Sequence, residues 1–469
     1  MLTYDLAERG KRTMYEFLYE EIKEDIMQGV LKAGEKLPSK RAMAEHMDVS
    51  IKTVENAYNQ LLLEGYITST EKKGYFVSKL SKGGNISTSY AAFSAKQKEE
   101  EILADFTAHN INYEKFPFAS WAKVMRETLT DYDTTLLKMV PFNGVEELRV
   151  QIAEHLYRYR GMQVSPDRII VGAGTEYLYG RLLQLLGKDA FYAVENPGYK
   201  KISRLYDANG AKWTYIDIDK NGMNVKALTA SGANVAHVSP EHHYPVGIVT
   251  PIGRRQELLA WAAEEPGRYI IEDDYDCEFR IVGRSIPSLQ SMDTNHRVIY
   301  MNNFSKTMVP SLRISYMVLP EKLMERYMAT LSFYSCTVSG FEQYAMARFM
   351  EKGYFERHIR RSINYYRHQR DKIRKMFRVS SLRKISRIIE TGAGTHFLLR
   401  VNTDLSDVEI KWAAKERGIL IQCLSEYCFE NQHLYRGFLI VNYSDMEEEQ
   451  LVRAIGELEK IFGVEDEKS

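Results

Sequence analysis

A short stretch of the sequence combines a lysine with a nearby arginine. Residues 302–315 read NNFSKTMVPSLRIS, so Lys306 directly follows Ser305 and stands seven positions before Arg313. A lysine amine becomes nucleophilic when burial or a neighbouring cation lowers its pKa, and it can then form a Schiff base with a carbonyl compound. The guanidinium of an arginine suits a phosphate. A lone lysine is more often a solvated surface residue, so the interpretation depends on its companions.

Two further motifs follow predicted strands. GAGT (172–175) passes directly from a strand into a helix, where the helix-start N–H groups and the Thr175 hydroxyl suit a phosphate, although small residues also simply make tight turns. IIEDDYD (270–276) places acidic residues after a buried strand. These acids could cap a helix, lie in a solvated loop, bind a divalent metal or hold a pyridine nitrogen protonated, with Tyr275 as a nearby hydrogen-bond donor.

The ordered set of motifs is more informative than any one of them. Four motifs follow one another along the chain: a phosphate-type turn, an aromatic residue after Pro-Gly (Tyr199), the Asp-x-Tyr of residues 273–275, and the Ser-Lys pair followed by Arg313. Together they meet the demands of pyridoxal 5′-phosphate (PLP), namely phosphate binding, ring stacking, a partner for the ring nitrogen and a Schiff-base lysine. The sequence therefore predicts PLP as the cofactor and no metal.

The elements that must position these residues alternate between strand and helix. From about residue 105, short β-rich runs such as RIIVGAG, RYIIEDDY and RVIYMNNFS are separated by helical stretches. This alternation predicts an α/β domain with a largely parallel sheet. Ligands of such sheets bind at the carboxyl ends of the strands, and the candidate residues all fall there.

The first eighty residues have a different pattern. Apolar residues recur every four positions from Met14 to Ile26, which predicts a helix ending at Gly29. Ser39 and Ser50 are suitable N-caps for two more helices. Residues 65–80, GYITSTEKKGYFVSKL, read as a hairpin. Three helices and a hairpin form a winged helix-turn-helix, whose second helix of the pair enters the major groove of DNA.

The positions of polar residues favour DNA as the partner of this domain. Residues 1–80 hold 12 Lys/Arg and 13 Asp/Glu, so a helical interaction domain with a solvated charged face is the alternative. The basic residues nevertheless fall at the cap, the start of the recognition helix and the wing. The candidates for base contacts are Ser50, Lys52, Thr53 and Asn56, and those for phosphate contacts are Lys40, Arg41, Lys72 and Lys73.

Bulk properties set the remaining limits. The chain of 469 residues is too long for one core, and its 44% hydrophobic and 27% charged residues are ordinary for globular proteins. Four cysteines fit neither a disulfide framework nor a zinc site, and no window resembles a signal peptide or a membrane span, so we expect a cytoplasmic protein. We expect a DNA-binding domain (1–79), a linker (80–104) and an effector domain (105–469) with a small C-terminal α+β subdomain from about 345.

Specific stretches resemble a known family. Residues 37–77, LPSKRAMAEHMDVSIKTVENAYNQLLLEGYITSTEKKGYFV, look like the DNA-binding domain of GntR-type bacterial repressors, although Ile51 stands where the family often has arginine. Residues 141–178, 272–280 and 302–320 resemble fold-type I aminotransferases. The whole chain is similar to the MocR subfamily of GntR regulators, in which that enzyme fold is fused to a winged helix and serves as a sensor.

The resemblance assigns roles to single residues. It implies Lys306 as the Schiff-base lysine, Asp273 as the partner of the pyridine nitrogen and Tyr275 as the phenol near the ring 3-oxygen. Lys201 lies where an arginine meets the effector carboxylate in the GABA-responsive member. The other cofactor residues that it implies are Ala173, Gly174, Thr175, Tyr199, Ser305 and Arg313.

Two departures from the aminotransferases concern substrate binding. The segment VSPEHHYPVG (238–247) replaces their Asn-Pro motif, and His242 or His243 could fill that space or be structural histidines. The strand FLIVNYS (438–444) lacks the arginine that binds a substrate carboxylate, with Arg436 just outside it. Loss of that arginine would weaken the orientation on which catalysis depends.

Three functions fit these observations. The first is a PLP-dependent regulator that senses an amine, an amino acid or PLP through a Schiff base at Lys306 and binds operator DNA as a head-to-tail homodimer on paired half-sites. The alternative is an active aminotransferase with an appended DNA-binding domain. A third is a structural scaffold without cofactor. We expect the first, with residual transaminase activity left open.

Overall fold

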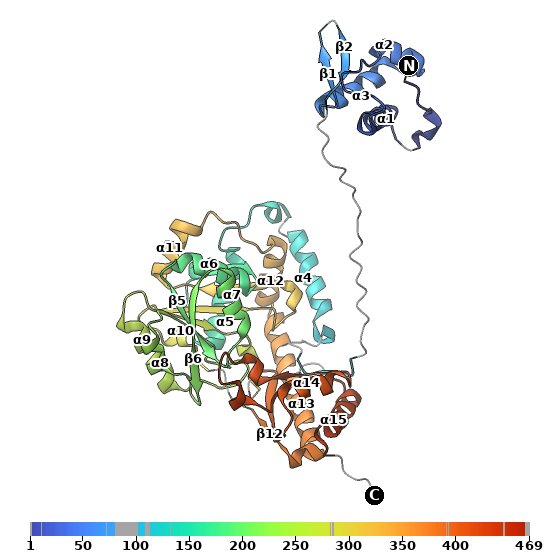
Figure 1. Ribbon diagram of the computed structural model, residues 1–469. Helices are drawn as coiled ribbons and strands as arrows, with labels where there is room; N and C mark the ends of the chain where they lie inside the picture. The colour runs from blue at the N-terminus through green and yellow to red at the C-terminus, as the bar shows by residue number, and fades with distance from the viewer. Residues whose placement is uncertain are drawn as a thin grey trace. The chain divides into compact units, whose positions relative to one another are not determined.

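The computed structural model describes residues 2–10, 12–71, 73–79, 102–107, 113–131, 133–281, 283, 286–390, 392, 394–443 and 446–464. The chain divides into two compact units, Met1–Lys98 and Glu99–Ser469 (Figure 1). Most of the predicted linker, residues 80–101, lies outside the described residues. No helix in the described ranges is long and apolar enough to cross a membrane.

The N-terminal unit is the expected winged helix-turn-helix. Ser39 and Ser50 each cap a helix by accepting a hydrogen bond from a backbone N–H three residues on. One face of each helix is apolar and meets the hairpin in a shared core that includes Leu18, Val54 and Val77. Its elements are α1 (Met14–Gln28), α2 (Lys40–His46), α3 (Ile51–Leu63), β1 (Ile67–Thr70) and β2 (Gly74–Val77).

The second unit is built on an eight-stranded sheet with the order β4-β11-β10-β9-β8-β5-β6-β7. The central strands from β10 to β6 are parallel, as predicted, while β11 and β7 run antiparallel to their neighbours. The strands are β4 (Ile169–Ala173), β5 (Phe191–Asn196), β6 (Lys212–Asp219), β7 (Gly222–Met223), β8 (Val235–Val238), β9 (Tyr269–Asp273), β10 (Val298–Asn303) and β11 (Ile314–Val318).

Helices cover both faces of this sheet, which is why strands such as β4, β8 and β11 are almost entirely buried. Along β4, Ile169 and Val171 join one core with α5 and α12, whereas Ile170 joins another with α6 and α11. The helices are α4 (Phe118–Asp131), α5 (Glu146–Arg160), α6 (Thr175–Leu186), α7 (Lys200–Ala208), α8 (Val225–Ser231), α9 (Ile252–Glu264), α10 (Leu289–Met292), α11 (Glu321–Leu331) and α12 (Gly340–Glu351).

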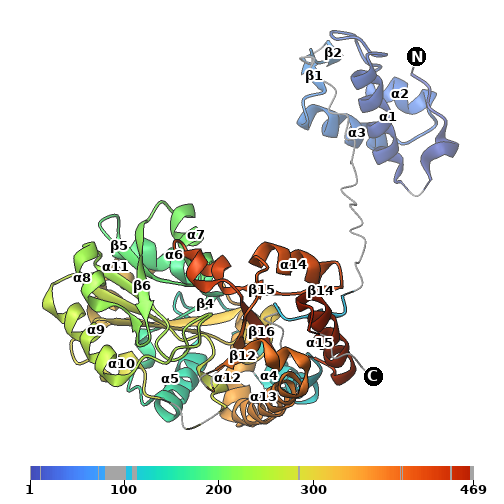
Figure 2. The same cartoon turned by 60° about the horizontal axis from the view of Figure 1, so that its bottom comes forward.

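A smaller antiparallel sheet, ordered β12-β13-β16-β15, follows the long helix α13 (Figure 2). The expected subdomain boundary near residue 345 falls within α12, which packs in the core of the large sheet. The elements here are α13 (Tyr354–Val379), β12 (Ser386–Ile389), β13 (His396–Val401), α14 (Asp407–Lys415), β14 (Ile419–Leu420), β15 (Gln422–Cys423), β16 (Phe438–Asn442) and α15 (Glu448–Phe462), and β14 pairs with β3 (Ala104–Asp105).

Candidate functional site

Residues from the carboxyl ends of β5, β8, β9 and β10 line one cavity of about 270 Å³. Parallel strands present these ends at the same edge of the sheet, so segments distant in sequence meet there. The sequence-predicted residues that line the cavity are Thr175, Tyr199, Lys201, Asp273, Tyr275, Ser305 and Lys306. The predicted Ala173, Gly174, Arg313, His242 and Arg436 are not among its lining residues.

Lys306 lies in the loop between β10 and β11. The Asn303 side chain fixes the start of this loop, because its Oδ1 accepts hydrogen bonds from the backbone N–H groups of Ser305 (3.0 Å) and Lys306 (3.3 Å). Burial lowers the pKa of the Lys306 amine to about 8, against a smaller opposing effect of the Asp276 carboxylate. A larger share of the amine is therefore neutral and nucleophilic near pH 7 than for an exposed lysine.

Asp273 ends β9 with one oxygen held and one oxygen free. The Tyr179 hydroxyl donates a 2.7 Å hydrogen bond to Oδ2, and Nε2 of His237 lies 3.7 Å from the same oxygen. Oδ1 is buried and has no hydrogen-bond partner among the described residues. A buried acceptor without a donor is costly, so this oxygen suits a ligand that brings an N–H, as a protonated pyridine ring does.

Two residues that support Asp273 are not identified from the sequence. Tyr179 lies four positions into α6, where its spacing indicates only a core face, and His237 lies within the apolar strand β8. The Tyr206 hydroxyl is 2.7 Å from Nδ1 of His237, which orients the imidazole ring. Burial, and then the Asp273 carboxylate, raises the pKa of Tyr179, so its hydroxyl stays protonated and donates to that carboxylate.

The turn at residues 172–175 is shaped around Arg313. Gly174 has φ of 91°, and a Cβ atom built on it would stand 2.2 Å from Nη2 of Arg313. The backbone of Ile314 pairs with Ala173 between β11 and β4, which brings the guanidinium to the start of α6. The Ala173 N–H itself donates to the Thr337 hydroxyl at 2.9 Å. Helix-start N–H groups beside a cation suit a phosphate.

Glu176, absent from the sequence-based site, connects this turn to Lys201. Its Oε2 accepts a 2.8 Å hydrogen bond from Arg313, and its Oε1 accepts one from the Lys201 amine. Burial opposes the ionisation of Glu176, but these hydrogen bonds and one from its own backbone N–H outweigh burial and lower its pKa to about 2. An acid in the first turn after the GAGT motif was the available sequence signal.

The remaining predicted residues lie around the cavity in different ways. Tyr199 packs edge to face against Tyr244, with ring centroids 5.7 Å apart. The Tyr275 hydroxyl is 3.1 Å from Nδ1 of His242, and that nitrogen also lies 2.8 Å from Asp276. His242 is thus a buried support for Tyr275. Arg436 is exposed and donates to the backbone carbonyls of Asp404 and of Leu405 (3.1 Å).

A lining carboxyl that the sequence did not single out is Glu195, in the Glu-Asn-Pro-Gly-Tyr segment at the end of β5. Its Oε2 accepts a 3.1 Å hydrogen bond from the Ser239 N–H and lies 3.6 Å from Nε2 of His243. Burial raises the pKa of Glu195 to about 8, so the carboxyl is largely uncharged at neutral pH. Burial also lowers the pKa of His243 to about 3, and this histidine is therefore neutral as well.

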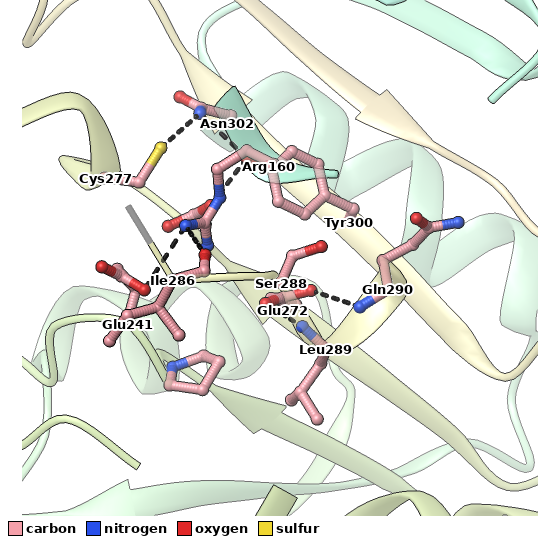
Figure 3. A network of polar contacts seen from close by, with 12 residues as sticks. Arg160, Glu241, Glu272, Cys277, Ile286, Ser288, Leu289, Gln290, Tyr300 and Asn302 are labelled. Carbon is pink, nitrogen blue, oxygen red and sulfur yellow. Dashed lines mark hydrogen bonds and ion pairs between the residues drawn. The ribbon is translucent and has the colours of Figure 1, made fainter. Parts of the chain in front are cut away.

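A buried network of polar contacts surrounds Arg160 (Figure 3). Arg160, at the end of α5, is 1% exposed, lies 2.9 Å from Asp274 and 3.4 Å from Glu241, and donates to the Ile286 carbonyl. Tyr300 donates a 2.7 Å hydrogen bond to Asp274. Because Asp274 lies between Asp273 and Tyr275, the network fixes the backbone that presents both to the cavity.

The DNA-binding candidates gather on α2, α3 and the hairpin. Ser50 accepts a hydrogen bond from the Thr53 N–H at 3.1 Å and so begins α3. Lys40 and Lys52 both pair with Glu55, at 2.8 and 3.0 Å. The candidates that the structure describes are Lys40, Arg41, Ser50, Lys52, Thr53, Asn56 and Lys73, whereas Lys72 lies outside the described residues.

A winged helix-turn-helix joined to an aminotransferase-like unit defines a transcriptional regulator that carries an aminotransferase-type domain. Residues 14–77 match the model of the bacterial regulatory proteins of the gntR family, and residues 102–458 match that of aminotransferase class I and II. The chain belongs to both families in this order, and it is a member of the MocR subfamily of GntR-type regulators.

Relatives match almost the whole chain. An uncharacterized HTH-type transcriptional regulator, YdeL of Bacillus subtilis, is 36% identical over 93% of this chain and 95% of its own. A probable rhizopine catabolism regulatory protein, MocR of Rhizobium meliloti, is 30% identical over 96% and 94%. Among solved structures, an archaeal alanine:glyoxylate aminotransferase covers 78% of this chain and 91% of its own at 22% identity with a TM-score of 0.69. This similarity to the solved aminotransferase is a similarity of fold.

Proposed function

We propose that this regulator binds PLP in the cavity and senses an amine, an amino acid or PLP itself through a Schiff base at Lys306. The observation that carries the proposal is the buried Oδ1 of Asp273, which has no partner among the described residues, in a residue that lines the same cavity as Lys306. When bound, PLP supplies an aldehyde that condenses with amines, and its charged ring nitrogen would satisfy Asp273.

The chain offers a residue for each remaining part of the cofactor. The phosphate would be held by the Thr175 hydroxyl, the N–H groups at the start of α6 and Arg313. Gly174 lets the Arg313 guanidinium come close to this turn, because it has no Cβ atom. Tyr199 would lie against the ring, and Tyr275, oriented by His242, would donate to its 3-oxygen. The neutral Lys306 amine is the nucleophile that attaches the cofactor.

We propose that ligand binding in the cavity changes the affinity of the winged helix-turn-helix for DNA. Residues at the start of α3 would contact base edges, while Lys40, Arg41 and Lys73 would contact phosphates. A ligand shifts DNA binding only if it binds the DNA-competent and the incompetent states with different affinities. We infer a homodimer, head to tail, on paired operator half-sites in the bacterial cytoplasm, as the subfamily implies.

The first test is the visible absorption spectrum of purified protein after PLP is added. A band of the lysine-bound cofactor that is absent in Lys306→Ala, together with selective binding to DNA upstream of its own gene that changes on addition of an amine, supports the proposal. No band at any PLP concentration, or no site-selective DNA binding, refutes it. Efficient release of a keto acid over many turnovers would favour an active aminotransferase instead.

A further inference from the structure

The cavity offers few cations to a ligand. Among its described lining residues, the lysines are Lys201 and Lys306, and none is an arginine. Under the proposed function, Lys306 is used by the cofactor aldehyde. Lys201 is therefore the cation at which a ligand carboxylate would have to bind.

Lys201 is already engaged by an internal anion. Glu176 bonds Lys201 through Oε1 and Arg313 through Oε2. It lies in the first turn of α6, where the helix dipole stabilises a negative charge. With its pKa lowered to about 2, Glu176 is ionised at every pH at which the protein would be used. If a phosphate draws Arg313 away, Lys201 remains as the side-chain cation paired with Glu176.

The other candidate for a carboxylate partner is occupied elsewhere. Arg436 uses its guanidinium on the carbonyls of Asp404 and Leu405, and it does not line the cavity. The strand beside it, β16 (Phe438–Asn442), contains no arginine. Neither Arg436 nor β16 therefore offers a second cation to a ligand in the cavity.

Apolar and aromatic side chains form much of the wall around the two lysines. Tyr199, Tyr244 and Phe429 line the cavity, as do the aliphatic Ile202 and Leu205 on α7. The carbon atoms of these walls favour a hydrocarbon or aromatic group, and they give no compensation for the desolvation of a carboxylate. A ligand carboxylate here would lose water and meet the negative charge of Glu176.

We propose that Glu176 is a specificity-determining residue, which by holding Lys201 makes the cavity select primary amines without a carboxylate over amino acids. This inference rests on the proposed function. The side chains of Lys201 and Glu176 are 51% and 34% exposed, so water screens the pair and its effect is moderate. We expect a selectivity of about tenfold rather than thousands.

The test compares matched ligands on the full-length protein saturated with PLP. Butylamine and 4-aminobutyrate share a four-carbon chain and differ by the carboxylate, and tyramine and tyrosine form a second pair. Half-saturating concentrations come from the change in visible absorbance. We expect each amine to bind about tenfold more tightly than its acid. Equal or tighter binding of both acids, or no response to any of the four, overturns the inference.

Variants separate the role of Glu176 from a general effect on the site. Glu176→Gln should tighten binding of the acids about fivefold or more and change amine binding less than twofold, because it releases Lys201. The double variant with Lys201→Met should lose that gain. If Glu176→Gln changes both ligand classes equally, or the gain persists without Lys201, the inference is wrong.

These results differ from those that would refute the proposed function. Absence of the cofactor band in wild-type protein, or its persistence in Lys306→Ala, contradicts the cofactor proposal and removes the basis of the inference. A normal band that responds best to amino acids leaves the cofactor proposal intact and refutes only the selection by Glu176.

Discussion

The Tyr179 hydroxyl donates a 2.7 Å hydrogen bond to Oδ2 of Asp273, while Oδ1 of the same carboxylate has no partner among the described residues. The protein therefore holds this carboxylate in place and leaves its second oxygen buried without a partner among the described residues, in a residue that lines the cavity. A carboxylate held in this way is preorganised for a cationic N–H donor, since little of its freedom remains to be lost on binding.

Replacing Asp273 by Asn should weaken PLP binding. The amide removes the charge that would keep a pyridine nitrogen protonated, and a hydrogen bond to a charged group contributes about 1.5–3 kcal/mol, or roughly a ten- to hundredfold change in Kd. Equilibrium titration with PLP measures this. Tyr179→Phe keeps the charge and should have a smaller effect. Wild-type affinity in Asp273→Asn would contradict the assignment.

Attachment of PLP should depend on pH through Lys306. The folded pKa of about 8 lies below the usual 10.5, so the neutral amine accumulates as pH rises toward 8 and changes little above it. The rate of appearance of the bound-cofactor band should rise about tenfold per unit below that pH and then level off. A rate that continues to rise to pH 10 would show an ordinary, solvated lysine.

Gly174→Ala should impair the phosphate turn. The added methyl would stand 2.2 Å from Arg313 Nη2, and φ of 91° disfavours any residue with a Cβ. We expect PLP affinity to fall at least tenfold. Gly180→Ala is the matched control, because Gly180 lies within α6, the helix that follows Gly174, and its Cβ would have nothing within 4 Å. That variant should keep its affinity and gain roughly 0.5–1 kcal/mol of stability.

Removal of the Arg160 side chain should destabilise the large unit. Arg160→Met leaves Asp274 buried without its cation, whereas Glu241 keeps its ion pair with Arg280 at 3.0 Å. Breaking a buried pair costs about 3–5 kcal/mol. The midpoint of thermal unfolding should fall by several degrees or more. Arg158→Met, on the same helix but 61% exposed, should barely change it. Similar midpoints for the two variants would contradict this role.

Glu55 should weaken DNA binding, because it pairs with both Lys40 and Lys52. In Glu55→Gln the two amines become free for phosphates, so operator affinity should rise severalfold. The slope of log K against log salt should become steeper by about 1–2. Glu45→Gln on α2 removes the same charge, but Glu45 forms no ion pair with any described residue. This variant should leave the slope unchanged. Equal effects of both substitutions would indicate net charge alone.

The sequence was sufficient for much of the architecture, because its signals are local. Serine caps, apolar spacing and β-rich runs act over a few residues. They correctly located the three helices and the hairpin of the N-terminal unit and strands β4, β9 and β10 of the large unit. The convergence of Thr175, Asp273 and Lys306 follows from one rule of parallel sheets. Their bound cofactor stays a prediction.

Other features were not predictable, because they depend on contacts far apart in the chain. Glu176 and Arg313 are 137 positions apart, and Tyr179 and Asp273 are 94 apart. Periodicity assigns Tyr179 to a helix core and gives no sign that its hydroxyl meets a carboxylate. The antiparallel return of β11 likewise depends on which neighbours its edges find in the sheet.

The antiparallel direction of β11 affects which ligands fit the site. Because β11 doubles back between β10 and β4, the short loop carrying Lys306 and Arg313 is anchored at both ends to the same sheet. The two anchored ends therefore fix the spacing between the Lys306 amine and the Arg313 guanidinium. Under the proposed function, a B6 vitamer must contact both groups. Pyridoxal, which lacks the phosphate, would contact the Lys306 amine but not the Arg313 guanidinium.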